Sequence, residues 1–320
     1  GIRDVAPSRG LGDVYKRQVL RRSRMKEKPF SKYQILANAV MIIWTLAIIL
    51  PFILLFMSSI TDENTLVANG YSFFPKKFSL ASYSYIIKSG GQILKAYGVS
   101  IGVTVVGTLL NVLLSALMAY PLSVKNLPGR NVMMFFVFFT MLFNGGIVPS
   151  YIMWTGTFHI KDTIFAQLLP NFLLSAWNVM MIRTYFTTSI PDGLYEAAEI
   201  DGASQFTIFW KIVLPLGKPI LVTMGTFAGL AYWNDWTNGL YYIVKNTGLY
   251  NVQNLLNQMV QNIQFLTQSS NSNVTAAAST IPATGIQMAI AFVAILPIML
   301  IFPSFQKYYA KGIALGAVKG

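Results

Sequence analysis

Cysteine is absent from the chain and histidine occurs once, at His159. Disulfides, thiol nucleophiles and zinc sites built from Cys and His are therefore largely excluded, and we predict no metal site. The lone histidine is predicted to be a residue at a membrane boundary and not a ligand. No serine stands in a motif typical of nucleophilic catalysis, so we predict no catalytic residues.

Charged residues are also scarce, at 11% of the chain against 54% hydrophobic residues. An ordinary soluble domain has about 25% charged residues and could not bury this much apolar surface. The formal net charge is +13, but the basic residues lie at the edges of apolar runs and do not form one basic cluster. We therefore predict no nucleic-acid partner, and we expect a polytopic membrane protein that has the lipid bilayer as its main solvent.

Long apolar runs recur along the sequence, and each is close to the roughly 20 residues that cross a bilayer as a helix. The six runs are Ile35–Ser59, Val99–Tyr120, Val132–Met153, Ile164–Ile182, Pro219–Leu240 and Gly285–Phe305. They predict an all-α fold with six transmembrane helices.

Lys and Arg are distributed unequally between the segments that connect these runs. With the N-terminus inside, 18 of them fall on the inner side and 6 on the outer side. Because Lys and Arg are retained in the cytoplasm, the chain is predicted to be a multi-pass protein of the plasma membrane with both termini cytoplasmic.

The first 24 residues contain no methionine and no apolar signal core. They match no targeting pattern, so residues 1–24 are predicted to be a disordered leader or an artefact, with Met25 as the natural start. Residues 25–320 are predicted to form one transmembrane domain. It contains an inner loop at 189–215 and an outer loop at 240–283.

The inner loop 189–215 has the signals of two short helices. Pro191 is suited to open a helix, Gly202 to end it in the left-handed conformation, and Ser204 to cap the next one, which Pro215 should end. Small Ala197 and Ala198 should allow close approach by another protein. The segment is either such a docking element or an ordinary amphipathic surface helix, and periodicity alone leaves both open.

The same segment resembles the EAA loop of ABC importer permeases. The resemblance rests on Glu196-Ala197-Ala198, on Gly202, and on Ile212-x-Leu214-Pro215 at the spacing of that family. In that family the loop docks on the ATP-binding subunit, which implies a coupling role for Glu196, Ala197, Ala198, Asp201 and Gly202. It also implies a second homologous permease, two ATP-binding subunits and an extracytoplasmic solute-binding protein.

No G-x-x-x-x-G-K-[ST] motif occurs in the chain, so a separate subunit is expected to hydrolyse ATP. We therefore predict no cofactor in this chain and no enzymatic activity of its own, with ATP and Mg bound by the partner ATPase.

Three shorter motifs resemble oligosaccharide, polysaccharide and alginate-type permeases of the maltose-type family. They are the stretches 144–149, 233–236 and 305–312. The resemblance implies a carbohydrate solute. Contact with solute or binding protein is predicted for Asn144, Trp233, Asn234, Asp235, Trp236 and Gln261. For Asp235, a second interpretation is an interfacial acid that caps or orients a helix.

Other functions fit the sequence less well. Import of amino acids or peptides is the alternative within the same class. An ion-coupled secondary transporter would need ionisable groups within the membrane, and only Asp235 falls within a predicted span. A membrane scaffold that anchors a cytoplasmic partner through residues 189–215 is the third alternative.

Overall fold

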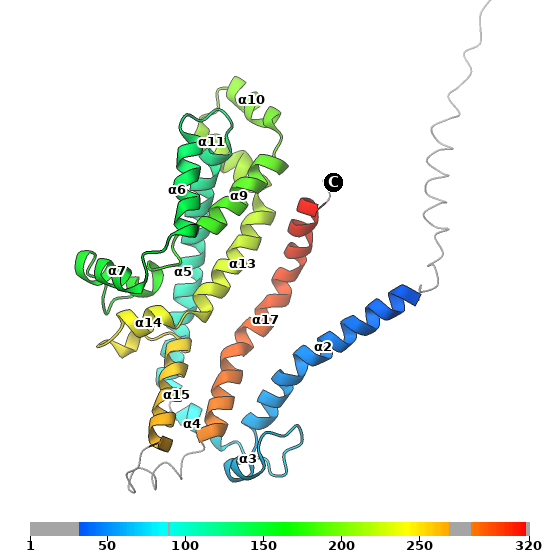
Figure 1. Cartoon of the computed structure of the whole chain (residues 1–320), viewed down its shortest axis with the longest axis vertical. Coiled ribbons are helices and arrows are strands. Elements are labelled where there is room, and N and C mark those ends of the chain that lie inside the picture. Colours follow the sequence, from blue (N-terminus) through cyan, green and yellow to red (C-terminus); the bar gives the residue numbers. More distant parts are fainter. Residues whose placement is uncertain (1–31, 89, 269–282, 318–320) are drawn as a thin grey trace, which may run out of the picture. The chain divides into compact units, whose positions relative to one another are not determined.

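The structure is a computed structural model that describes residues 32–88, 90–268 and 283–317 (Figure 1). It divides into two units, residues 1–54 and residues 55–320, which are described separately. The predicted leader at 1–24 lies outside the described residues. Among the described residues, α-helices dominate and no strand longer than the isolated bridge between Thr61 and Phe78 occurs.

The first unit consists of most of helix α2, which spans Lys32–Ser59 and matches the first predicted run. Its described side chains up to Phe52 are all exposed, and its apolar residues lie on every face. Such a helix is stable where lipid or another helix covers it.

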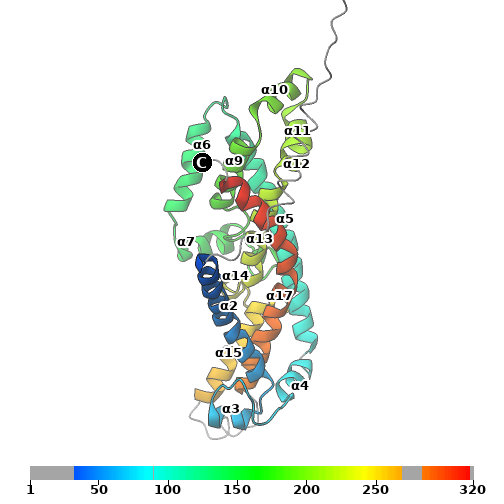
Figure 2. The same ribbon diagram turned by 90° about the vertical axis from the view of Figure 1, so that its right-hand side faces the viewer.

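Three long helices lie side by side in the second unit: α5 (Gly90–Ser123), α13 (Lys218–Asn234) and α17 (Ala283–Ala317), as Figures 1 and 2 show. Helices α5 and α17 confirm the second and sixth predicted runs as single helices. Small residues bring α5 and α13 together, because Gly229 lies against Thr108 and Gly107 lies under the Tyr232 ring. Close approach at small residues is the usual way in which helices associate within membranes.

The third predicted run is not one helix. Helix α6 (Arg130–Leu142) is followed by α7 (Ile147–Ile152) and a π-helix (Met153–Thr157), with a bend of 110° between the two parts. Gly146 has φ +86°, and its amide donates to the Asn144 side chain at 2.8 Å. A glycine with positive φ interrupts the helix here. The expectation that Val132–Met153 forms one continuous span is therefore wrong.

The fourth and fifth predicted runs are also interrupted. Short α8 (Phe165–Leu168) is separated by a loop from α9 (Ala176–Ser189), and α13 stops at Asn234 before α14 (Thr237–Tyr242). The helix Gln205–Leu216 bends by 79° into α13. In the described part, three helices are long and apolar enough to cross a membrane, or up to five if each bent pair counts as one span.

The two predicted loops lie at opposite ends of α5. Figures 1 and 2 show α10 (Asp192–Ile200) near one end, and α4 (Ala81–Lys88) and α15 (Val252–Gln268) near the other. The predicted outer loop 240–283 therefore contains a 17-residue helix, whose apolar side packs against α5 and α17. Sequence composition alone suggested a loop, because Asn and Gln outnumber apolar residues on its exposed side.

Glu63, in short helix α3 (Glu63–Asn69), fixes the start of α17. Its two carboxylate oxygens accept hydrogen bonds from the Thr284 and Gly285 amides, each at 2.8 Å. A carboxylate at a helix N-terminus satisfies amides that have no partner within the helix.

The contact between Gly107 and Tyr232 gives a direct test of the α5–α13 interface. A Cβ atom on Gly107 would lie 2.5 Å from the Tyr232 ring, whereas a Cβ on Gly102 of the same helix meets nothing within 4 Å. Gly107→Ala should destabilise the protein by about 1–3 kcal/mol through overpacking. Gly102→Ala should be neutral or stabilise by up to about 1 kcal/mol. Thermal unfolding in detergent measures both, and equal Tm values for the two variants would contradict this packing.

Candidate functional site

The segment 189–215, which we call the docking element after its predicted role, begins with helix α10. Pro191 is the N-cap of this helix, which ends at Ile200, two residues before Gly202 with its φ of +75°. The Gly202 and Ala203 amides donate to the carbonyls of Glu199 and Ala198 at 3.0 and 2.9 Å. The predicted helix start and the left-handed glycine are confirmed.

A second helix follows at once. Helix α11 (Gln205–Ile208) begins at Ser204, whose hydroxyl accepts a hydrogen bond from the Thr207 amide at 3.2 Å, as predicted. Pro215, however, does not end it. The chain continues through a π-helix (Phe209–Val213) and α12 (Leu214–Leu216). A π turn commonly accommodates an interruption of the backbone hydrogen bonds of a helix. The chain bends at Gly217 and not at Pro215.

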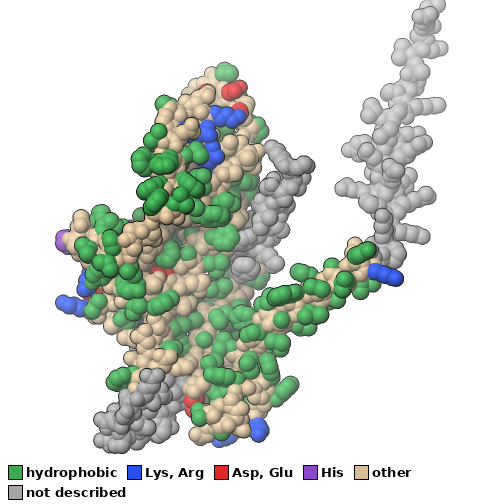
Figure 3. Space-filling view, viewed as in Figure 1, with side chains coloured by type: hydrophobic (Ala, Val, Ile, Leu, Met, Phe, Trp, Pro, Cys, Tyr) green, Lys and Arg blue, Asp and Glu red, His purple; other side chains and the backbone are tan. Residues whose placement is uncertain are grey.

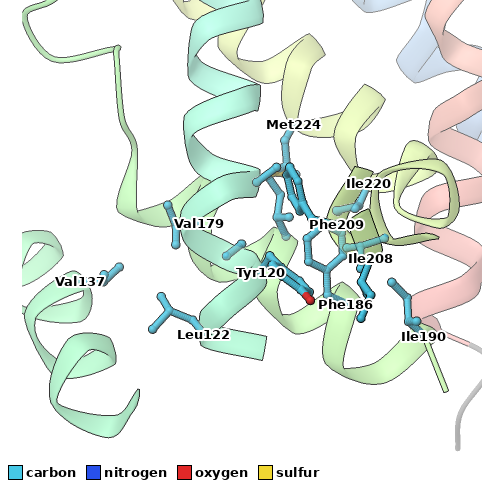
Figure 4. Close-up of a cluster of buried hydrophobic side chains, with 14 of the residues drawn as sticks. Tyr120, Leu122, Val137, Val179, Phe186, Ile190, Ile208, Phe209, Ile220 and Met224 are labelled. Carbon is cyan, nitrogen blue, oxygen red and sulfur yellow. The ribbon is translucent and has the colours of Figure 1, made fainter. Parts of the chain in front are cut away.

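The inner side of the docking element packs into the core of this chain, as Figure 4 shows for Tyr120, Phe186, Ile208 and Phe209. Ala198 belongs to this cluster and is only 8% exposed. Its small side chain therefore serves an internal contact, and the expectation that it faces another protein is wrong. Glu196, Ala197, Asp201 and Gly202 are exposed and remain available to a partner.

Hydrogen bonds join the docking element to the end of α5. The Tyr120 hydroxyl donates to the side-chain oxygen of Gln205 at 2.5 Å, and the Gln205 amide nitrogen donates to the Glu199 carboxylate at 2.7 Å. The Tyr120 ring also stacks on Tyr195 with 6.4 Å between centroids. A displacement of α10 would therefore be passed to α5 through short, directional contacts.

The second feature is a polar hinge, which we define as residues 235–236 between α13 and α14. Asp235 is 5% exposed. One of its carboxylate oxygens accepts bonds from the Thr237 amide at 3.0 Å, the Thr237 hydroxyl at 2.7 Å and the Asn238 amide at 3.3 Å. This geometry fits the interpretation of Asp235 as an acid that caps a helix, and its contact with solute or binding protein stays a prediction.

Buried side-chain amides satisfy the backbone around this hinge. Asn251 donates to the Asp235 carbonyl at 2.7 Å, Asn254 donates to the Trp236 carbonyl, and Asn238 donates to the Pro170 carbonyl at 3.1 Å. Sequence reasoning missed all three asparagines, because the run Pro219–Leu240 was expected to be one continuous helix and no break at residue 235 was predicted. They connect α14 and α15 with the loop before α9.

The predicted solute contacts do not form one site. Trp233 and Asp235 are buried, whereas Asn144, Asn234, Trp236 and Gln261 are exposed. No hydrogen bond or ring contact of the described residues joins Asn144 or Gln261 to the stretch 233–236. Trp233 instead lines an apolar groove of about 520 Å³ between α5, α13 and α17. Within the described residues, no group of three or more His, Cys, Asp or Glu could hold a metal ion.

Comparison with known proteins supports an assignment to one family. Residues 96–315 match the family described as binding-protein-dependent transport system inner membrane component. The chain is 36% identical over 272 residues to Protein LplC of Bacillus subtilis strain 168, covering 85% of this chain and 90% of that protein. It is also 36% identical over 288 residues to the polygalacturonan/rhamnogalacturonan transport system permease protein YtcP of the same organism, covering 90% and 98%.

A solved structure is similar over most of the chain. It is the crystal structure of a bacterial ABC transporter involved in the import of the acidic polysaccharide alginate. The TM-score is 0.74 at 26% sequence identity, with 88% of this chain and 100% of that chain covered.

The polar hinge predicts a specific stability effect at Asn251. Asn251→Ala would leave the buried Asp235 carbonyl without its donor, and an unsatisfied buried group costs about 1–3 kcal/mol. Asn262→Ala removes an exposed amide from α15, the helix that begins directly after Asn251, and is the matched control. Thermal unfolding in detergent should show a lower Tm for Asn251→Ala alone. Equal Tm values would mean that the hinge does not depend on this bond.

Proposed function

The chain belongs to the family of binding-protein-dependent transport system inner membrane components, and on that premise we propose that it is the permease subunit of an ABC importer for oligosaccharides or polysaccharides. It moves the solute into the cytoplasm with ATP that a separate subunit hydrolyses. The observation that carries this proposal is the docking element. Its inner side is bonded to α5, and its outer side presents Glu196, Ala197, Asp201 and Gly202.

A carbohydrate solute is supported by the relatives. The relatives include a polygalacturonan/rhamnogalacturonan permease and arabinooligosaccharide permeases, and the similar solved structure is that of a transporter involved in the import of alginate. All of these solutes are saccharides. Amino acids and peptides remain the alternative solute class, and reconstituted uptake of an oligosaccharide against a peptide distinguishes the two.

The exposed side of α10 suits docking on a second protein. Ile200 is 86% exposed at the tip of the helix, between the acids Glu199 and Asp201. A protruding apolar side chain flanked by charges resembles the centre and rim of a protein–protein interface. We assign this side to an ATP-binding subunit, which would hold the ATP and Mg.

The partners that follow are a second homologous permease, two ATP-binding subunits and an extracytoplasmic solute-binding protein. The distribution of Lys and Arg supports a cytoplasmic location for both termini and α10. Helix α15, at the other end of α5, then faces outward. Its exposed side carries Gln261 and Asn262, which offer uncharged hydrogen-bonding groups to the binding protein. Residues 269–282, which complete this outer segment, lie outside the described residues.

The left-handed turn at Gly202 gives the sharpest test of docking. Gly202→Val must adopt a positive φ that a β-branched side chain resists, at a cost of about 1–3 kcal/mol. Gly193→Val is the matched control, because it lies in the same segment 189–215, within α10, also meets nothing within 4 Å and has no positive φ. Gly202→Val should lose co-purification with the ATPase and oligosaccharide-stimulated ATP hydrolysis in proteoliposomes.

Membrane abundance should stay the same in both variants, since neither position lies in an apolar run. Wild-type ATPase co-purification and stimulation in Gly202→Val would refute the assignment of residues 196–202 as the coupling element.

The orientation in the membrane can be tested by labelling single introduced cysteines, because the chain contains no cysteine of its own. Ile200→Cys lies on exposed α10, and Gln261→Cys lies on exposed α15. An impermeant thiol reagent added to whole spheroplasts should label Gln261→Cys and spare Ile200→Cys. Inside-out vesicles should reverse this pattern. Labelling of Ile200→Cys from outside would overturn the orientation.

A further inference from the structure

Helix α5 reaches from the inner segment of the chain to the outer one. It is a single α-helix of 34 residues, which is about 51 Å at 1.5 Å per residue. The hydrocarbon core of a bilayer is about 30 Å thick, so a helix of this length extends beyond it. Figures 1 and 2 show α10 near one end of α5 and α15 near the other. The space-filling view in Figure 3 shows basic side chains at the end that carries α10.

The outer contact of α5 is a hydrogen bond between buried groups. The Ser100 hydroxyl accepts a bond from the amide of Val252, the first residue of α15, at 2.8 Å. The first amides of a helix have no partner within that helix, so a buried one needs an acceptor from another part of the chain. Ala96, one turn away on α5, packs in the same cluster as Val252 and Leu255. The start of α15 is therefore fixed to α5.

The inner contact of α5 is made by Tyr120, near the other end of the helix. Its hydroxyl donates to the Gln205 side chain at 2.5 Å, and Gln205 donates to the Glu199 carboxylate at 2.7 Å. Gln205 is the first residue of α11, and Glu199 lies in α10. One chain of hydrogen bonds thus joins both helices of the docking element to α5.

Between these two contacts, one side of α5 is packed against the rest of the protein. Asn111 donates to the Phe172 carbonyl at 2.6 Å and accepts a bond from Asn178 at 2.7 Å. Packed interiors have low compressibility and transmit strain, so α5 should move as one body. The buried residues on this side recur every three or four positions and include Ala96, Ser100, Val103, Gly107, Asn111 and Ser115.

We propose that α5 transmits the binding of the solute-binding protein at α15 to α10, with Ser100 and Tyr120 as the positioning residues at its two ends. A displacement of α15 moves α5 through the Ser100 bond, and α5 moves α10 through the bond of Tyr120 to Gln205. The proposal rests on the proposed function, because that function supplies the two partners.

The test measures ATP hydrolysis by the assembled complex in proteoliposomes, with and without the purified solute-binding protein loaded with an oligosaccharide. Ser100→Ala removes the acceptor of the Val252 amide and should lower the stimulation by the binding protein about tenfold, a factor of the size expected for one buried hydrogen bond. ATPase co-purification and the basal rate should stay at the wild-type level.

Ser115→Ala is the matched control. It removes a buried hydroxyl from the same helix, and this hydroxyl has no hydrogen-bond partner among the described residues. Stimulation should therefore stay at the wild-type level. An equal loss in Ser115→Ala and Ser100→Ala would mean that the packing of α5 and not the bond to α15 is responsible, which contradicts the proposal.

A double variant tests whether the two ends act in one path. Tyr120→Phe keeps the ring that stacks on Tyr195 and loses the bond to Gln205, so it should also lower stimulation about tenfold. If Ser100 and Tyr120 act in series, the double variant loses no more than either single variant. Independent effects would multiply to a loss of about a hundredfold.

Three results would overturn the proposal. They are wild-type stimulation in Ser100→Ala, a hundredfold loss in the double variant, and a loss of basal hydrolysis in Ser100→Ala as large as the loss of stimulation. The last result would leave Ser100 with a role in stability alone. Failure of the proposed function differs from all three, because the wild type itself would then lack ATPase co-purification or stimulation by the binding protein.

Discussion

Backbone hydrogen bonding in a low-dielectric surrounding is the constraint on which this structure depends. Lipid offers no water to an exposed amide or carbonyl, so a broken helix must find its partners within the protein. Three of the predicted spans are broken, and side chains supply the missing bonds. Asn111 donates to the Phe172 carbonyl at 2.6 Å, and the Tyr232 hydroxyl donates to the Leu168 carbonyl at 2.8 Å. These bonds tie the interrupted region between α8 and α9 to α5 and α13.

The same constraint explains how the few acids are used. Asp235 binds the first amides of α14, and Glu63 binds those of α17. Asp162 accepts bonds from the amides of Val244, Lys245 and Asn246 at 2.7 to 3.2 Å. These backbone bonds lower the pKa of Asp162, which keeps it ionised at neutral pH. These three carboxylates thus fix backbone, whereas Asp62 and Asp192 form ion pairs with Lys77 and Lys125.

The docking element combines a fixed inner side with an accessible outer side. It is joined to α5 by the hydrogen bonds of Tyr120, Gln205 and Glu199, and its Ala198 is buried in the core. Its other side exposes Ile200 and the adjacent acids. A partner that moves α10 would also displace α5. Short hydrogen bonds and packed rings between the two transmit a displacement better than solvent-exposed side chains do. The Ser100 hydroxyl of α5 in turn accepts a bond from the Val252 amide at the start of α15, at 2.8 Å.

Local sequence determined the features that depend on a single residue and its neighbours. The cap at Ser204 and the left-handed Gly202 were predicted because side-chain chemistry and φ preference are local properties. The apolar character of α5 and α17 was also evident, since hydropathy needs no partner. Tertiary structure alone decided where spans break and which side of a residue is covered. Ala198 is buried because Tyr120 and Phe209 lie against the docking element. Asn251 is buried and bonded to the Asp235 carbonyl because α15 packs back on the hinge. Both depend on residues distant in sequence, and periodicity carries no information about them.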